Sequence, residues 1–324
     1  MSTPEIRVPA HEPLVHLLRD GMVEGVHHGS VIVLGADGST LFAAGDPDAA
    51  FYPRSTAKPL QATAMARLGL RLSPAGFAIA SASHSGERIH LHAALAVLDG
   101  HSPDELGNPA DFPYDPVERD HWLATGQAPN RLAHNCSGKH AAMLATCRLH
   151  GWPVAGYLDP AHPLQRAIAA TVAELTGQGI ARVAVDGCGA PLFAISLRGL
   201  ATAASKLALA APDSPEGLVA QGIRQHPELV GGTRRDVTAT MRAVPGLIAK
   251  DGFEGVQIAA LPDGTSIAVK IADGGDRARP VVLAAALKLC GIDLPPGSDT
   301  LCVTGKLAES LDDLLKPEAL ARVR

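Results

Sequence analysis

Residues 53–61 read PRSTAKPLQ, and this stretch marks the boundary between two differently patterned parts of the chain. It predicts a helix that begins at Ser55 and ends near Leu68, because Gly69 lies where a glycine commonly terminates a helix. Pro59 is compatible with this helix, since a proline costs little in the first turn. Ser55 and Lys58 are three residues apart and should therefore lie on one helical face.

Strand patterns lie toward both ends of the chain. Residues 23–34 are rich in Val and Ile, and residues 39–44 return after an Ala-Asp-Gly turn. Residues 255–261 and 265–271 flank a Pro-Asp-Gly turn in the same way, and an amphipathic helix follows at 279–289. Helical spacing or high alanine content fills the middle of the chain, at residues 89–98, 140–150, 163–175, 192–210 and 217–226.

This order predicts an α/β fold of the α+β type. The simplest assembly is one antiparallel sheet built from both chain ends and flanked by helices, with the helical region inserted between them. We expect residues 1–54 and 245–324 to form the sheet region and residues 55–244 to form a mainly helical region. The two regions are intertwined, so we expect them to act as one functional unit.

Composition excludes several classes of function. The 324 residues carry a net charge of −5, and 20 Arg and only 8 Lys are spread along the chain without a basic block. Clustered positive charge and stacking aromatics are therefore lacking, which argues against a nucleic-acid partner. We find no signal-peptide pattern and no apolar run of about 18–20 residues, and the five cysteines are scattered. These features predict a cytoplasmic protein without a membrane partner.

Ser55 and Lys58 form an S-x-x-K pattern that suits nucleophilic catalysis. The positive end of the helix favours a developing alkoxide on Ser55 and disfavours the proton on Lys58. A neutral Lys58 would then act as the base, which requires its pKa to fall by roughly 3 units from about 10.4. The simpler alternative is a capping serine followed by a solvated lysine, because S-x-x-K alone is common by chance.

Two further segments could complete such a site. Residues 80–87 (ASASHSGE) suit a tight loop that presents Ser83 to a cleft, or a polar turn that caps a helix. Lys250 lies just before a strand, as does the second basic element of S-x-x-K enzymes. Asp251 stands where those enzymes have Thr or Ser, so a carboxylate-binding hydroxyl is not expected there.

Two cysteines lie beside glycine-rich turns. Cys136 and Cys188 could supply thiolates to zinc, but their spacing alone does not predict a metal site. The usual alternative for each is a small buried apolar residue.

Taken together, these segments resemble one family, the L-asparaginases of the Rhizobium etli type, also called the asparaginase II family. The resemblance spans roughly residues 20–290. It is carried, in the family's order, by the following blocks: Val23-Glu24…His28-Gly29, Pro53-Arg54-Ser55-x-x-Lys58-Pro59-Leu60-Gln61, Ala82-Ser83-His84-x-Gly86-Glu87, His134-Asn135-Cys136-Ser137-Gly138-Lys139-His140, Asp186-Gly187-Cys188 and Lys250-x-Gly252-x-Glu254-Gly255.

The resemblance implies a fold similar to serine β-lactamases, penicillin-binding proteins and glutaminases. It implies an amidohydrolase (EC 3.5.1.1) that converts L-asparagine to L-aspartate and ammonia, acting as a homodimer. Two Ser–Lys pairs are implied, Ser55 with Lys58 and Ser83 with Lys250. One zinc ion is implied at Cys136, Lys139 and Cys188, near the substrate and not essential to the nucleophile. Substrate-binding roles are expected for Arg54, His84, Glu87, Asn135, His140 and Asp186.

Two other functions remain open from the sequence. One is a β-lactamase-like or penicillin-binding-protein-like serine hydrolase, which shares S-x-x-K and a downstream Lys-x-Gly. The other is a non-catalytic binding protein of the same fold, which the unusual Asp251 leaves possible. The asparaginase interpretation predicts that Ser55 attacks the amide carbon, with Lys58 as the base and Ser83 and Lys250 relaying protons.

Overall fold

The long strand β2 (Met22–Leu34) organises the main sheet, because its two halves pair with different neighbours. The first half pairs with β1 (Glu12–Arg19), and the second half lies between β3 (Thr40–Ala44) and β9 (Ser266–Ile271). This arrangement comes from a computed structural model, which describes residues 8–294 and 300–314. The two ends of the chain therefore meet along β2.

The main sheet is antiparallel throughout, and both chain ends contribute strands. Its order is β10-β1-β2-β9-β8-β7, with β3 beside β2. The added strands are β7 (Ile248–Gly252), β8 (Val256–Ala260) and β10 (Leu301–Val303). The prediction of an antiparallel sheet flanked by helices is confirmed, although β1, β7 and β10 were not expected from the sequence.

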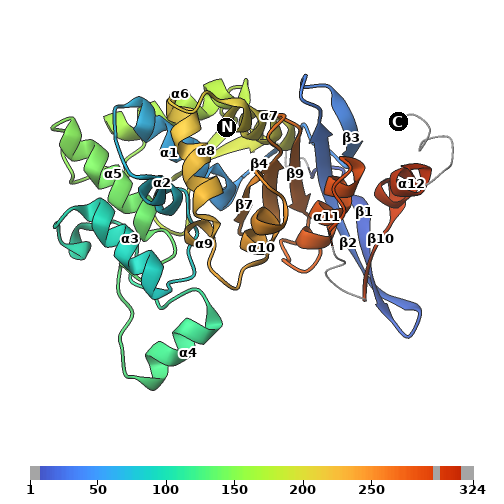
Figure 1. Cartoon of the computed structure of the whole chain (residues 1–324), viewed down its shortest axis with the longest axis horizontal. Helices are drawn as coiled ribbons and strands as arrows, with labels where there is room; N and C mark the ends of the chain where they lie inside the picture. The colour runs from blue at the N-terminus through green and yellow to red at the C-terminus, as the bar shows by residue number, and fades with distance from the viewer. Residues whose placement is uncertain (1–7, 295–299, 315–324) are drawn as a thin grey trace, which may run out of the picture.

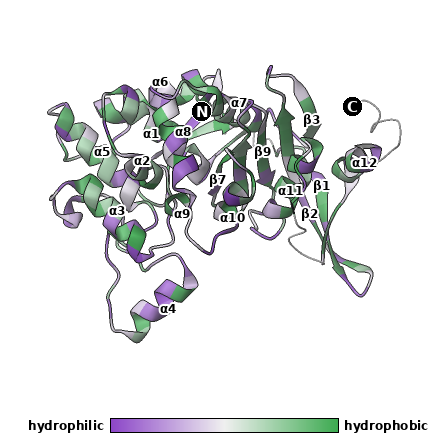
Figure 2. Ribbon diagram, in the orientation of Figure 1, coloured by the Kyte–Doolittle hydropathy of each residue, from purple (hydrophilic) through white to green (hydrophobic). Residues whose placement is uncertain are grey.

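Helices cover both faces of the sheet where β7, β8 and β9 lie. These strands are buried almost completely, so they lack the alternation of a strand with one wet face. The helix α7 (Leu197–Leu209) packs on β2, β8 and β9, while α11 (Arg279–Leu289) also packs on β9 and lies in front of the sheet in Figure 1. Hydrophobic residues concentrate in these strands (Figure 2).

The middle of the chain forms a layer of helices beside the β7 edge of the sheet (Figure 1). Among these helices, α2 and α5 approach so closely that a Cβ on Gly138 would lie 2.3 Å from the Ile79 carbonyl oxygen. The short helix α4 projects from the rest of the layer (Figure 1). The layer contains α1 (Lys58–Arg67), α2 (Pro74–Ala80), α3 (Arg88–Leu98), α4 (Pro116–Ala124), α5 (Ser137–Leu149), α6 (Pro163–Thr176), α8 (Pro215–Gln225), α9 (Pro227–Val230) and α10 (Asp236–Ala243).

The prediction of one helix over residues 192–210 is wrong at its start. Residues 192–196 belong to β6 (Pro191–Ser196), the centre of a small sheet with β4 (Ala50–Phe51) and β5 (Arg182–Val185). Every residue of β6 is buried, so no alternation distinguishes it from a buried helix. The helix begins only after Ser196, whose hydroxyl accepts a hydrogen bond from the Gly199 N–H at 3.0 Å.

Two short 3₁₀ helices, η1 (Arg54–Ala57) and η2 (Pro103–Glu105), and the helix α12 (Gly305–Leu314) complete the described elements. No helix among the described residues is both long and apolar enough to cross a membrane.

Candidate active site

The S-x-x-K segment spans the junction between η1 and α1. Arg54 has a left-handed φ of 49°, which is an uncommon conformation for a residue other than glycine. Such strain is often stored at functional sites. Ser55 and Lys58 are only 3% and 1% exposed, so the motif is buried and is not a solvated cap.

Lys58 contacts two other segments of the site, the loop at Ala82 and Ser83 and the segment at Cys136. Its Nζ donates hydrogen bonds to the Ala82 carbonyl oxygen at 2.6 Å, to Ser83 Oγ at 3.0 Å and to Cys136 Sγ at 3.0 Å. The structure thus brings Lys58 to Ser83, whereas the sequence spacing had suggested Ser55. No hydrogen bond among the described residues joins the Ser55 hydroxyl to Lys58.

The loop after α2 holds Ser83 through its backbone. The Ser83 N–H donates to the Val230 carbonyl oxygen at 3.0 Å, and the His84 N–H donates to the Asn135 carbonyl oxygen at 3.1 Å. The His84 ring is buried, with Nδ1 accepting from the Gly86 N–H and Nε2 therefore donating to Ser137 Oγ at 2.8 Å. Burial holds the pKa of His84 well below its ordinary value, so His84 orients this loop as a neutral ring.

Lys250 lies on β7 and is fully buried. Its Nζ donates to the Asp251 carbonyl oxygen at 2.6 Å and to Asp251 Oδ1 at 2.8 Å, and no hydrogen bond in the described chain joins it to Ser83. Burial lowers the pKa of Lys250 to about 8, against the opposing charge of Asp251. Although burial opposes ionisation, Lys250 and Arg235 hold the pKa of Asp251 well below its usual range.

The strand β7 passes directly over the start of the S-x-x-K segment. A Cβ on Gly252 would lie 3.1 Å from the Thr56 nitrogen and 3.2 Å from the Ser55 nitrogen. The backbones of η1 and β7 therefore lie against each other at the start of the S-x-x-K segment.

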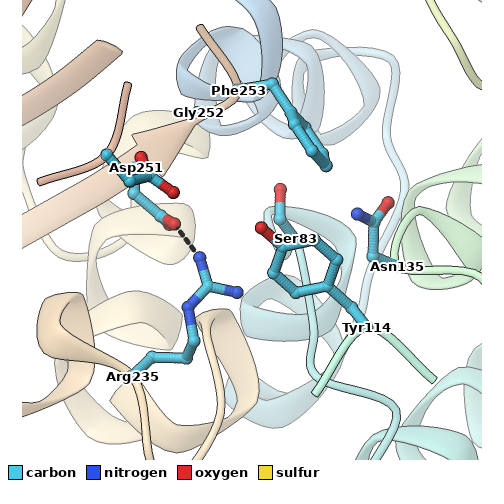
Figure 3. Close-up of a pocket in the computed structure, with 8 residues that line it drawn as sticks. Ser83, Tyr114, Asn135, Arg235, Asp251, Gly252 and Phe253 are labelled. Carbon is cyan, nitrogen blue, oxygen red and sulfur yellow. Dashed lines mark hydrogen bonds and ion pairs between the residues drawn. The ribbon is translucent and has the colours of Figure 1, made fainter. Parts of the chain in front are cut away.

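A small pocket opens beside this gap. Figure 3 shows Ser83 at its centre, with Asn135 on one side and the Asp251–Arg235 ion pair on the other. The rings of Tyr114 and Phe253 meet edge to face, with centroids 5.5 Å apart. Eight residues line the pocket: Ser83, Tyr114, Asn135, Arg235, Asp251, Gly252, Phe253 and Asp276.

The three predicted zinc ligands, Cys136, Lys139 and Cys188, lie close together next to Lys58. Lys139 Nζ donates to Cys188 Sγ at 3.0 Å, and Cys136 and Cys188 belong to one buried cluster. A hydrogen bond from Cys136, together with the charge of Lys139, lowers the pKa of the Cys188 thiol below its ordinary value. Cys136 Sγ also lies 3.0 Å from Asn135 Oδ1, which links this cluster to the pocket wall.

Although burial opposes its charge, Cys188 and Cys136 hold the pKa of Lys139 above its ordinary value, so this amine could become a third zinc ligand only by losing a proton. The described residues contain no group of three or more His, Cys, Asp or Glu side chains able to hold a metal, so a zinc site here depends on Lys139 as the third donor. His140 is the residue next to Lys139 in the chain. Its buried Nε2 has no hydrogen-bond partner among the described residues, so this polar atom is unsatisfied.

Four of the other predicted substrate-binding residues, Arg54, Glu87, His140 and Asp186, do not line the Ser83 pocket. Arg54 Nε pairs with Asp186 Oδ1 at 2.9 Å, and both residues line a second cavity of about 380 Å³. His140 Nδ1 shares a 2.6 Å hydrogen bond with the Tyr157 hydroxyl. The Glu87 carboxylate accepts from the Thr233 N–H and Oγ1 at 2.7 and 2.8 Å, outside the residues that line the Ser83 pocket.

Sequence reasoning missed four residues of the pocket, Tyr114, Arg235, Phe253 and Asp276. Arg235 and Tyr114 lie in loops without a recognisable motif, and Tyr114 covers the Arg235 guanidinium with its ring centroid 4.8 Å from Cζ. The unusual Asp251 was the one available signal, because a buried carboxylate requires a cationic partner.

Several solved structures match this chain with low structural similarity and low sequence identity. Mglu in its native form matches with a TM-score of 0.45 and 16% identity, over 84% of this chain and 66% of Mglu, so this chain spans less than two thirds of that protein. A β-lactamase from Mycobacterium bovis matches with a TM-score of 0.43 and 15% identity, over 80% of this chain and 94% of that one. EstCE1, a hydrolase with promiscuous acyltransferase activity, matches with a TM-score of 0.43 and 14% identity, over 80% and 93%.

A search of curated proteins found no match. The sequence profile of the family described as L-asparaginase II matches residues 15–308, which include every candidate site residue above. The chain therefore belongs to the L-asparaginase II family.

Proposed function

We propose that this chain hydrolyses the side-chain amide of L-asparagine to L-aspartate and ammonia. The observation that carries the proposal is the 3.0 Å contact between Lys58 Nζ and Ser83 Oγ beside the buried Ser55, in a chain of the L-asparaginase II family. A lysine amine placed among serine hydroxyls is the arrangement that activates a serine nucleophile without histidine.

In the proposed mechanism, Lys58 first loses to solvent one of the three protons that it donates in this structure, and its neutral amine then takes the proton of Ser55. The Ser55 oxygen then bonds to the amide carbon, and N–H groups of η1 and β7 stabilise the oxyanion. The carbon–nitrogen bond breaks as the proton passes from Lys58 to the leaving ammonia. Water next attacks the aspartyl ester, and its proton returns through the Ser83 and Lys250 groups, which restores Ser55.

Cys136, Lys139 and Cys188 would hold one zinc ion, which when bound would supply a fixed positive charge for orienting the substrate. Lys58 contacts Cys136 at 3.0 Å, so the position of its amine depends on this cluster. Arg54 and Asp186, which pair at the second cavity, would border the same end of the substrate.

Ser83 is the alternative nucleophile, and two observations favour it. It already accepts a hydrogen bond from Lys58, and it lines the pocket in Figure 3, whereas Ser55 does not. Trapping with an electrophilic asparagine analogue, followed by peptide mass spectrometry, separates the two. We expect the label on Ser55, and a label on Ser83 would reverse the roles of the two serines.

The activity itself is tested by ammonia release from L-asparagine. We expect turnover by the wild type, loss in Ser55→Ala and partial loss after chelation. Rapid hydrolysis of nitrocefin would instead favour a β-lactamase-like enzyme. A folded, zinc-loaded protein that releases no ammonia and binds asparagine would support a non-catalytic role. We also propose a homodimer, which light scattering of the purified protein tests.

A further inference from the structure

Arg235 is a partly buried cation in the pocket for which the proposed mechanism has no role. It directly precedes α10, and its side chain is 15% exposed. Its Nη2 pairs with Asp251 Oδ2, but its Nη1 is buried and has no hydrogen-bond partner within the described ranges. A buried guanidinium N–H without an acceptor is rare in folded proteins.

The unsatisfied nitrogen faces the pocket. In Figure 3, the terminal nitrogen of Arg235 that makes no ion pair points toward the side where Ser83 and Tyr114 lie. The Tyr114 ring lies 4.8 Å from Arg235 Cζ and shields the guanidinium from water. Nη1 is closed to solvent and the pocket, at about 10 Å³, has room for about one water, so an acceptor reaches this N–H when the Tyr114 ring moves aside.

The carboxylates already in the pocket are engaged elsewhere. Asp251 is shared between Arg235 and Lys250. Asp276 accepts from Arg279 Nε at 3.0 Å, and Arg279 also pairs with Asp236 at 3.0 Å. Neither lining carboxylate bonds to Nη1 of Arg235, so this donor remains for a ligand.

Contacts on both sides hold the loop that carries Arg235. Glu87 accepts two hydrogen bonds from Thr233, and Arg234 pairs with Asp115 and Glu118 at 2.8 Å each. Asp251 fixes one edge of the Arg235 guanidinium. A binding residue that is held in this way loses little freedom when its ligand arrives.

We propose that Arg235 binds a free carboxylate of the substrate through Nη1, while the amide of the same molecule faces the serines. The inference rests on the proposed function and names its substrate class: small amides that carry a carboxylate a few bonds away, as the α-carboxylate of asparagine does. A planar guanidinium matches a carboxylate oxygen in both charge and geometry. Arg235 is then a specificity-determining residue.

Equilibrium binding tests this assignment without turnover. We would titrate the full-length protein with L-aspartate and with L-asparaginamide, in which carboxamides replace both carboxylates, so that no carboxylate remains to bind in a reversed orientation. The wild type should prefer L-aspartate by roughly tenfold to hundredfold, because a hydrogen bond between charged groups is lost with the amide. Arg235→Gln should remove most of this preference. Arg242→Gln, at an exposed arginine on α10, should keep it.

The outcomes separate this proposal from the proposed function. Equal preference in wild type and Arg235→Gln, or no preference in the wild type, would overturn the carboxylate assignment even if asparagine is hydrolysed. A preference that depends on Arg235 without ammonia release would support the assignment and overturn the proposed function. If Arg235→Gln does not fold, Arg235→Lys replaces it. A lysine cannot bridge Asp251 and a ligand in one plane, so its preference should fall, and an unchanged preference would overturn the assignment.

Discussion

Lys58 is the central residue of the candidate site, since its amine bonds to the loop that carries Ser83 and to Cys136 of the cysteine cluster. It is 1% exposed, and all three of its hydrogen-bond partners are acceptors. Lys58 can act as a general base only if its amine can lose its proton. Arginine is effectively never deprotonated in proteins. Replacing Lys58 by arginine therefore keeps the positive charge but removes the ability to accept a proton.

We therefore expect Lys58→Arg to lower kcat for ammonia release by about 10²–10⁴-fold, the usual contribution of a general base. Lys206→Arg, at an exposed lysine on α7 that bonds to the Glu174 carbonyl oxygen, is the matched control and should retain activity. Circular dichroism would verify that both variants fold. Substantial activity in folded Lys58→Arg would exclude Lys58 as the base.

Lys250 predicts the pH dependence. Its pKa of about 8 lies below the ordinary 10.5, so the neutral amine rises from about a tenth at pH 7 to about nine-tenths at pH 9. If neutral Lys250 accepts a proton during turnover, kcat/KM should increase over this range with a midpoint near 8. The negative charge of Asp251 raises this pKa, so Asp251→Asn should move the midpoint to lower pH. A midpoint that stays in place would mean that another group controls the profile.

The same shift affects stability in a defined direction. Because the folded protein holds the pKa of Lys250 below its unfolded value, a charged Lys250 disfavours the folded state below about pH 8. That cost decreases as pH rises from about 8 toward 10.5, where Lys250 is neutral in both states.

At the scale of elements, the site depends on how closely β7 approaches η1. Glycine is favoured at position 252 because a Cβ there would lie 3.1 and 3.2 Å from two backbone nitrogens. Backbone conformation is not the reason, since the φ of Gly252 is not positive. We expect Gly252→Ala to displace the strand slightly and to reduce kcat about hundredfold, since small misplacements at a reacting centre are costly. Gly179→Ala, where a Cβ would contact nothing within 4 Å, should leave kcat unchanged. Equal activity in both variants would show that the approach is not catalytic.

The projecting helix α4 gives a second prediction at this scale. Asp115 caps this helix by accepting from the Val117 and Glu118 N–H groups at 2.9 and 3.2 Å, and it also pairs with Arg234. Asp115→Ala should destabilise α4 locally by about 1–2 kcal/mol, seen as faster amide hydrogen exchange in this helix. It should also raise KM, because Tyr114 is the adjacent residue of the pocket. Asp120→Ala, at an exposed position on α4, is the control.

At the scale of the whole molecule, the cysteine cluster joins two distant segments. Cys136 precedes α5, whereas Cys188 lies in the turn between β5 and β6. Native mass spectrometry should find one zinc per chain, and Cys188→Ala should abolish it. Because zinc binds the folded state, chelation should lower the melting temperature while some activity remains. Cys302→Ala, at an exposed cysteine, should keep the metal. Zinc retained in Cys188→Ala would place the metal elsewhere.

Much of the fold could be predicted from the sequence because its signals are local. The helix at 279–289 matches α11 at both ends, and Pro163 and Gly177 mark the limits of α6. The fully buried strand β6 could not be distinguished from a helix, since it has no wet face to produce alternation. The strand β7 was missed because Lys250, Asp251 and Gly252 form a polar turn pattern in the sequence, although all three are buried.

By itself, the sequence determined that Ser55 and Lys58 share a helix start, that strands lie toward both chain ends, and that few lysines are available to lose a proton. Only the tertiary structure decided which side chains meet. Lys58 bonds to Ser83 across 25 positions, Lys139 to Cys188 across 49, and Arg235 to Asp251 across 16. Spacing along a chain fixes contacts only within one helix or strand. Contacts between elements depend on how the core packs, and motif spacing does not encode that packing.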